Sequence, residues 1–571
     1  MIQAPKTFAL ETYAARAAQY YQGLVDADGL PYFNVFWTDP PEAVHDWPDF
    51  GDVMSRQLQG CAMSRLVTGR RVEIEDRWRQ KVLSYIDPQT GLLTRPQTNF
   101  SERKADFGDA ALTLFALSTL YLDSPDERLH GVIDHMLSGI LKMPLPGKME
   151  AGFLIKTLMV AARIAGRDDA VEHAGRIVAG LLGPGGFLPP DNRFPRNAHM
   201  HLTLRGLVGA ADWAAHVGDS TMLARVAALY EFVRTITTRF GFLCEAYQRQ
   251  GDIISCETCA IMDYLGVAAT LANHGWPQYW ADVERTTRNH LVESQITDGA
   301  WLGACPNPPP DTHQFTWRDI GRRTAGAYAG WSSPNHILAC RESMVHWGGP
   351  EIRGKVRALQ NCCGGSGTHG LFIAWKNAAR FEDDVLSVHL HIDKLLPQAE
   401  IRGLQPYQGK LAISLRQRCS DVRVRIPEFA TAGQVRACSQ TFEGTAPLSP
   451  RPQGDYLHLG AHPSGATLLL EYPLELRTEE FAVGNEGFRQ YPYRATWKGD
   501  TVVRMEPLGS EHATGFSDFD KCQIATYYGR EGPGPLYQRE HMIPDQAPEL
   551  SELGMDRGAV DCWRLGARPP A

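Results

Sequence analysis

Residues 367–392 read GTHGLFIAWKNAARFEDDVLSVHLHI, and the spacing of the apolar residues changes within this stretch. Up to Phe381 the apolar residues recur every three or four positions, which is typical of a helix with one buried face. From Val385 to Ile392 they alternate with polar residues, which is typical of a strand. The stretch therefore marks the junction between a helical part and a β-rich part of the chain.

On the N-terminal side of this junction, amphipathic tracts follow one another. They cover residues 8–24, 52–68, 71–86, 107–122, 128–142, 149–165, 168–182, 201–216, 219–238, 256–273, 277–294 and 367–382. Twelve successive helices fit six antiparallel hairpins, which can close into a two-layered (α/α)6 barrel over residues 1–384. A helical-repeat solenoid is the competing architecture, but no fixed repeat of 34 or 40 residues is visible.

On the C-terminal side, residues 410–415, 422–426, 456–459 and 467–472 show the same alternation as the first strand. Turn residues separate these segments, which predicts an antiparallel β-sandwich region over residues 385–540. The fold class expected is therefore multidomain, with α and β parts. Residues 541–571 are polar and rich in proline, and we expect no structure there.

One segment inside the helical part lacks helical periodicity. Residues 300–360 contain the run Pro306-Asn307-Pro308-Pro309-Pro310 and several aromatic side chains. A long irregular segment inside a compact domain is usually a functional loop or a lid, and we expect one here.

The composition is that of an ordinary globular protein. The chain has 571 residues, 43% of them hydrophobic, and 57 Lys and Arg against 65 Asp and Glu give a net charge of −8. This excludes disordered, collagen-like and coiled-coil chains, and the absence of a basic excess argues against nucleic-acid binding. The sequence has no run of 18 apolar residues, so we expect no membrane helix. No signal peptide is visible, and we therefore expect a cytoplasmic protein.

The cysteines are unevenly placed. Two tight pairs occur among the twelve cysteines, in the sequences SCETCA (255–260) and NCCGGSG (361–367). In the cytoplasm such pairs are more often metal ligands or nucleophiles than disulfides. Zinc takes four ligands in a tetrahedron. The candidate ligands are Cys256, Glu257, Cys259, Cys362 and Cys363.

Two ligand sets are open. The first combines the four cysteines, and Cys256 and Cys259 would then share one face of a helix because they are three residues apart. The second replaces Cys256 by Glu257. Because Glu257 and Cys259 are two residues apart, they would converge only at an irregular helix start.

The residues after the second pair favour a reactive site. A run of glycine and small polar residues, 364–370, precedes the apolar helical tract. Cys362 would then lie near a helix N-terminus, where the helix dipole and the free amides favour a thiolate. A bound zinc ion would favour it further.

At these residues the sequence resembles glycoside hydrolase family 127, the β-L-arabinofuranosidase group. The residues Glu257-Thr258-Cys259-Ala260 and Asn361-Cys362-Cys363 match two motifs of that family. Residues 383–390 look like its entry into a sandwich domain, and residues 279–285 like the helix after the first motif. The segment 197–212 resembles a helix that begins with an active-site histidine.

The resemblance implies an (α/α)6 barrel followed by β-sandwiches, and a retaining hydrolase that forms a glycosyl thioether. It selects the second set of zinc ligands, which is Glu257, Cys259, Cys362 and Cys363. It makes Cys362 the nucleophile and Glu245 the acid/base residue, and it places His199 against the sugar hydroxyls. The substrate expected is a small oligosaccharide or glycoside, and the sandwich could mediate a homodimer.

The chain departs from the family pattern at several points. The family usually has Pro-Pro-Asn where this chain has Gly364-Gly365-Ser366, and a Gly-His pair where it has Gly108-Asp109. Asp109 would then bind substrate in place of an imidazole and contact different hydroxyls. Together these departures suggest a related furanosidase that acts on a different sugar.

Two other functions compete with this one. The same barrel could carry a sugar epimerase or lyase, but those chemistries rely on His or Tyr and leave the paired cysteines unused. A non-catalytic carbohydrate-binding protein could hold a structural zinc ion with the four cysteines.

Overall fold

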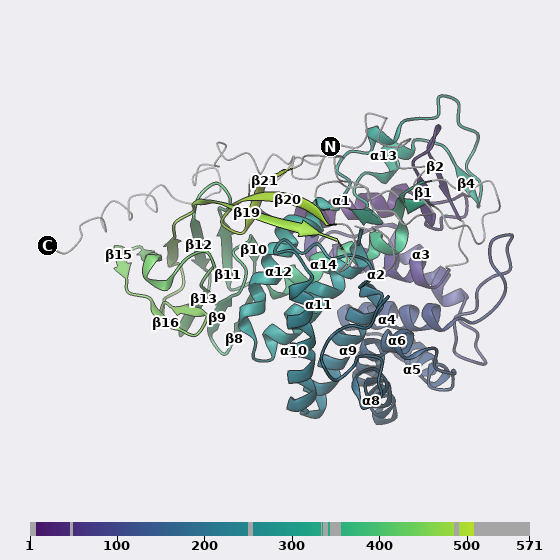
Figure 1. Ribbon diagram of the computed structural model, residues 1–571, viewed down its shortest axis with the longest axis horizontal. Helices are drawn as coiled ribbons and strands as arrows, with labels where there is room; N and C mark the ends of the chain where they lie inside the picture. The colour runs from purple at the N-terminus through teal and green to yellow at the C-terminus, as the bar shows by residue number, and fades with distance from the viewer. Residues whose placement is uncertain are drawn as a thin grey trace.

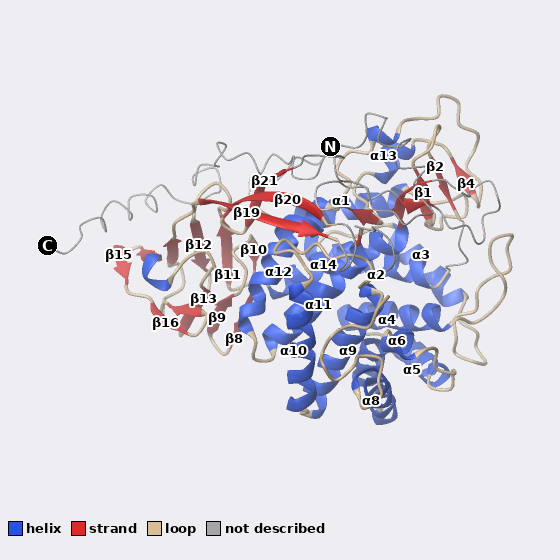
Figure 2. Cartoon of the chain, viewed as in Figure 1, coloured by secondary structure: helices blue, strands red, loops and turns tan. Residues whose placement is uncertain are grey.

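The structure is a computed structural model that describes residues 7–45, 50–248, 255–332, 334, 341–342, 356–484 and 490–506. It joins a helical domain to several sheets (Figure 1). Figure 2 shows the helices gathered together, with β8–β18 on one side of them and β1, β2 and β4 toward the opposite end. Residues 541–571 lie outside the described ranges. Within those ranges, no helix has the length and apolar character needed to cross a membrane.

Every expected helical tract overlaps a helix. The helices are α1 (Leu10–Gly23), α2 (Asp52–Thr68), α3 (Ile74–Ser84), α4 (Phe107–Asp123), α5 (Glu127–Ile140), α6 (Lys148–Gly152), α7 (Ile155–Ala165), α8 (Asp168–Leu182), α9 (Met200–Val217), α10 (Ser220–Thr235), α11 (Thr258–Asn273), α12 (Trp280–Thr286), α13 (Ile320–Thr324) and α14 (Asn361–Asn377). The tract 149–165 is divided between α6 and α7.

Six helices pack side by side in a closed succession. Helix α2 packs against α4, α4 against α7, α7 against α9, α9 against α11, α11 against α14, and α14 against α2 again. The other helices pack on members of this ring, as α1 does on α2 and α10 on α9. The apolar faces of both groups form one continuous buried core. The 3.6-residue periodicity of the sequence is therefore satisfied by helix-on-helix burial.

Helix α14 differs from its expected bounds. It begins at Asn361 instead of 367, so the glycine run lies inside the helix, and it ends at Asn377 because residues 379–382 form a strand. A Cβ atom at Gly365 would clash with the carbonyl oxygen of Arg56, and one at Gly367 would clash with the ring of Tyr328. The glycines therefore serve the close packing of α14 against α2 and against Tyr328, and they do not form a loop.

A five-stranded sheet positions the start of α14. Its strands, in spatial order, are β4 (Phe315–Thr316), β2 (Glu42–Val44), β1 (Asn34–Phe36), β7 (Val356–Gln360) and β6 (Arg341–Glu342). The sequence did not predict this sheet. Strand β7 runs directly into α14, and the amide of Asn361 donates to the carbonyl of Phe33 at 2.8 Å. The sheet thus positions the start of α14, where Cys362 and Cys363 lie.

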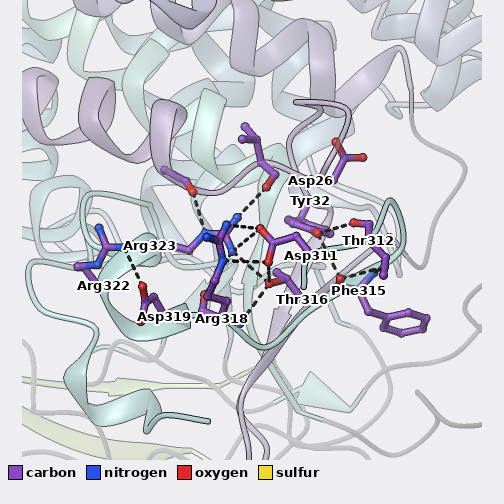
Figure 3. A network of polar contacts seen from close by, with 12 residues as sticks. Asp26, Tyr32, Asp311, Thr312, Phe315, Thr316, Arg318, Asp319, Arg322 and Arg323 are labelled. Atoms are coloured by element: carbon purple, nitrogen blue, oxygen red, sulfur yellow. Dashed lines mark hydrogen bonds and ion pairs between the residues drawn. The ribbon is translucent and has the colours of Figure 1, made fainter. Parts of the chain in front are cut away.

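The described part of the segment expected to be a lid is anchored. Arg323 donates to the carbonyl oxygens of Gly23 at 2.8 Å and Val25 at 2.6 Å, and it forms an ion pair with Asp311 at 3.2 Å (Figure 3). The hydroxyl of Tyr32 donates to the carbonyl of Thr312 at 2.7 Å. These contacts tie residues 311–324 to residues 23–32, which argues against free movement of this part.

The C-terminal strands confirm the alternation of the sequence. They are β8 (Ala379–Glu382), β9 (Val385–Val388), β10 (Lys394–Leu395), β11 (Ala399–Gly403), β12 (Lys410–Leu415), β13 (Asp421–Arg425), β14 (Arg436–Thr441), β15 (Gly444–Leu448), β16 (Arg451–Gln453), β17 (Tyr456–His458), β18 (Thr467–Glu471), β19 (Leu476–Val483), β20 (Tyr491–Lys498) and β21 (Thr501–Glu506).

Two of the C-terminal sheets share a core and a third does not. The sheets β10-β11-β12-β18-β14-β15 and β16-β17-β13-β9-β8 bury one common apolar cluster. Their ladders are antiparallel except that of β9 with β13, which is parallel. A parallel pair is allowed there because β10–β12 lie between the two strands in the chain. The sheet β19-β20-β21 packs instead on the core of the helical domain.

A buried ion-pair network joins the helical domain to these sheets. Glu284 of α12 is fully buried and pairs with Arg288 at 2.9 Å and with Arg425 of β13. Its carboxylate also accepts from the amide of His391 at 3.0 Å. Burial alone would raise the pKa of Glu284, but the two guanidinium groups outweigh it and hold that pKa below its usual range. The ionised carboxylate therefore stabilises the fold at pH values above the ordinary pKa of glutamate, about 4. This contribution is lost as the pH falls from about 4 toward the lowered pKa of the folded state.

We predict that Glu284→Gln lowers the stability of the fold by about 3–5 kcal/mol, because it leaves the guanidinium groups of Arg288 and Arg425 buried without their counter-charge. Thermal unfolding at pH 7 measures the effect. The matched control is Glu480→Gln, which removes an exposed ion pair with Arg494 and should cost less than about 1 kcal/mol. Equal unfolding temperatures for the two variants would contradict the prediction.

Candidate metal centre and active site

Four potential metal ligands meet inside the helical domain. Glu257, Cys259, Cys362 and Cys363 are buried, and their ligand atoms all lie within 4.8 Å of one another. The Sγ atom of Cys363 lies 3.6 Å from that of Cys259 and 3.9 Å from that of Cys362. The group is built from the starts of α11 and α14, two neighbouring helices of the ring.

Glu257 and Cys259 converge because a strand turns directly into a helix. Glu257 ends β3 (Cys256–Glu257), which pairs with β5 (Trp331–Ser332), and it is the N-cap of α11 with φ −82° and ψ 130°. Its side chain therefore leaves extended backbone, whereas that of Cys259 leaves the first helical turn. This is the irregular helix start that the second ligand set requires.

Cys256 is not part of the group. It is fully buried, and its Sγ lies 3.8 Å from the carbonyl oxygen of Glu257. Within the described residues, the cluster of potential ligands contains Cys259, Cys362 and Cys363 but not Cys256. The four-cysteine set is therefore not formed, because Cys256 lies on the strand β3 and Cys259 on the helix that follows it.

The group fits a tetrahedral metal ion such as zinc. Zinc–sulfur bonds of about 2.3 Å place the sulfurs of a tetrahedral site about 3.8 Å apart, and the two measured distances are 3.6 and 3.9 Å. The Oε2 atom of Glu257 is buried and has no hydrogen-bond partner among the described residues. Burial raises the pKa of the Cys259 and Cys363 thiols well above the usual range. A divalent cation would offset that burial and bind this carboxylate oxygen, whose neighbour on the other side is the Nε2 atom of His199 at 3.4 Å.

A second group adjoins the first through Glu257. The Nε2 atom of His199 lies 3.4 Å from Glu257 and 3.6 Å from Glu245, and the three residues also form a potential ligand group. His199 is the N-cap of α9, where its ring accepts from the amide of Leu202 at 3.4 Å. The imidazole therefore lies between two carboxylates.

Backbone pairing holds Glu245 in place. Its carbonyl accepts from the amide of Met200 at 2.8 Å, and its amide donates to the carbonyl of Ser255 at 2.8 Å. Its neighbour Ala246 forms a bridge with His199. Glu245 is 5% exposed. The structure thus brings Glu245, His199 and Glu257 together although they come from three separate segments.

Asp109 lies in neither group. It is buried in the first turn of α4, where it pairs with Arg95 at 2.5 Å and accepts from the amide of Asp52 at 3.2 Å. Burial raises the pKa of its carboxyl to about 6, against the opposing effect of Arg95. With these partners Asp109 holds the start of α2 against α4, and a role in substrate binding stays a prediction.

One residue of the site gave no signal in the sequence. Arg56 of α2 donates to the Sγ atom of Cys259 at 3.7 Å and to Ser366 at 3.0 Å. It lies 203 positions from Cys259 in the chain, and a buried arginine in an amphipathic helix has no local pattern that reveals it. The tertiary fold alone places it under the thiols.

Solved structures resemble this chain over most of its length, although no protein-family model and no curated protein matches its sequence. A GH127 beta-arabinofuranosidase has a TM-score of 0.58 at 13% identity, over 87% of this chain and 83% of its own. A GH127 beta-L-arabinofuranosidase from Geobacillus stearothermophilus T6 has a TM-score of 0.55 at 13% identity, over 88% and 80%. A structure described as a glycoside hydrolase has a TM-score of 0.56 at 12% identity, over 84% and 85%. At these identities the likeness establishes a GH127-like fold.

We predict that Glu257→Ala abolishes stoichiometric zinc binding, because it removes one of the four ligands. Cys256→Ala should keep the zinc ion, since this thiol packs outside the group. Metal analysis of both purified variants after dialysis measures the outcome. Zinc lost from Cys256→Ala and kept by Glu257→Ala would show that the four cysteines are the ligands instead.

Proposed function

We propose that this chain is a zinc-dependent retaining glycoside hydrolase with Cys362 as its nucleophile. In this proposal the helical ring is an (α/α)6 barrel, and the two sheets with a common core form a β-sandwich region. The observation that carries the proposal is the buried group of one carboxylate and three thiols, with a second buried carboxylate beside it. The GH127-like fold supports it as an analogy.

The residues Glu257, Cys259, Cys362 and Cys363 would hold the zinc ion. When bound, zinc supplies a Lewis acid that keeps the thiol of Cys362 ionised and makes its sulfur a better leaving group. Cys362 is the second residue of α14. The positive end of the helix dipole and the amides without a partner inside the helix at that end of α14 further favour the thiolate.

In the reaction itself, Cys362 acts as the nucleophile and Glu245 as the acid and then the base. The Sγ atom of Cys362 attacks the anomeric carbon while the carboxyl of Glu245 donates its proton to the departing oxygen. In the second half, Glu245 takes a proton from water, and the water oxygen displaces the sulfur from the same carbon. Two displacements at one carbon retain its configuration. The cycle requires Glu245 to carry a proton at its start.

His199 is suited to orient the sugar. It lies between Glu245 and Glu257, and about 29% of its side chain is exposed, more than that of either carboxylate. An imidazole in this position can donate to or accept from a ring hydroxyl. The substrate class proposed is a small oligosaccharide or glycoside with a terminal furanose, either β-L-arabinofuranose or a related sugar that Asp109 helps to select.

We predict that Cys362→Ser abolishes hydrolysis without unfolding the protein, because a serine hydroxyl stays protonated where a zinc-bound thiolate would attack. A screen of aryl furanosides and pyranosides on the wild-type protein identifies the substrate, and the variant is then assayed on it. Cys256→Ser is the matched control and should keep its activity. Undiminished hydrolysis by Cys362→Ser would exclude the mechanism.

The role of Glu245 is tested by the leaving group. Glu245→Ala should lose about 100- to 10,000-fold in kcat/KM on glycosides with poor leaving groups, because their oxygen needs a proton. The loss should be much smaller on activated aryl glycosides, whose oxygens leave as anions. Equal losses on both kinds of substrate would contradict a role as the acid.

A further inference from the structure

The guanidinium group of Arg56 contacts one of the thiols. Arg56, which is 7% exposed, donates from Nη1 to the Sγ atom of Cys259 at 3.7 Å and to the Oγ atom of Ser366 at 3.0 Å. Cys259 belongs to α11, Ser366 to α14 and Arg56 to α2. One side chain thus links three helices of the ring at the level of the candidate metal centre.

Further contacts to Asp52 and His201 fix the position of this guanidinium group. Its Nε pairs with Asp52, one turn earlier on α2. Its Nη2 contacts the Nε2 of His201 at 3.2 Å, and the Nδ1 of that imidazole meets Asp263 at 2.5 Å. The carboxylate of Asp263 therefore orients His201, and His201 orients Arg56.

The net charge of the metal centre with its ion bound explains why a buried cation would be needed beside it. A divalent cation held by three thiolates and one carboxylate carries a net charge of about −2, and burying such a charge is costly unless a counter-charge pairs with it. Hydrogen bonds to ionised acceptors are also about twice as strong as those between neutral groups. Arg205 is a second buried cation nearby, but it pairs with Asp263 at 3.8 Å and lies over the ring of Phe115.

We propose that Arg56 is a positioning residue of the metal centre, which donates a charged hydrogen bond to the Cys259 sulfur and offsets the negative charge of the thiolates. The proposal rests on the metal site of the proposed function. By drawing electron density from the Cys259 sulfur, Arg56 weakens the donation of that ligand. More of the metal's positive charge is then available to the sulfur of Cys362, which must leave in the second half of the reaction.

The glycine run of α14 also contributes to the contact between Arg56 and Cys259. A side chain at Gly365 would clash with the carbonyl of Arg56, so glycine at this position sets the short separation of α2 and α14. Ser366, the next residue, accepts from the guanidinium group. Gly365 and Ser366 thus let the side chain of Arg56 reach Cys259.

Arg56→Met should weaken zinc affinity by about 10- to 100-fold, the usual range for residues that support metal ligands, because the loss of the counter-charge to the buried thiolates outweighs the stronger donation of Cys259. Competition with a chromophoric chelator measures this without any substrate. In the cobalt-substituted protein, loss of the hydrogen bond should move the sulfur-to-cobalt charge-transfer band to longer wavelength, because the sulfur electrons are less stabilised. Gly365→Ala should shift the band in the same direction by a smaller amount.

The matched control is Arg65→Met, which removes another arginine of α2 that pairs with Glu75 and Asp123 away from the thiols. Its zinc affinity and cobalt spectrum should equal those of the wild type. Arg56→Lys keeps the charge and should recover part of the affinity. Zinc bound by the wild type and by Arg56→Met with equal affinity and equal cobalt spectra would overturn this proposal, whereas no zinc in the wild type would overturn the proposed function itself.

Discussion

The burial of Asn361 is the constraint on which the site depends. It is the first residue of α14, it is fully buried, and its backbone is bonded at both ends, to the carbonyl of Phe33 and to the side chain of Gln57. Its side-chain amide is bonded to the hydroxyl of Tyr20 and to the carbonyl of Tyr32. Because leaving any one of these groups buried and unpaired would cost about 1–3 kcal/mol, the start of α14 has one position.

The position of Asn361 determines where the sulfurs of the candidate metal centre lie. Cys362 and Cys363 follow Asn361 directly, so their sulfurs lie where the sheet and helices α1 and α2 place the asparagine. On the opposite side, strand β3 delivers Glu257 in extended backbone just before α11 begins. The potential ligands thus come from two helix starts, each preceded by a strand, and the close packing of α2 brings Arg56 into contact with Cys259. In the proposed function, a metal ion and the guanidinium group of Arg56 together offset the negative charge of the buried thiolates.

Local periodicity predicted the regular elements well and the short ones poorly. The sequence predicts the helices because their apolar residues recur every three or four positions, and it predicts the strand Lys410–Leu415 with the bounds that the structure has. The sheet that includes β1, β4 and β7 was missed because its strands have two to five residues and join segments about 300 positions apart. The predicted helix begins at 367, later than α14, because a run of glycines is typical of a turn. In this protein the glycines instead allow close packing of the helix.

The sequence by itself determined the kinds of element, their order and the five residues that could bind a metal. Without a resemblance to a known family, it left open whether Cys256 or Glu257 completes the site. Only the tertiary structure decided this, because the direction of each side chain depends on where β3 ends and α11 begins. The same holds for Arg56 and Cys259, whose contact spans 203 positions. Contacts of this kind follow from packing and buried hydrogen bonds between distant segments, which no local pattern encodes.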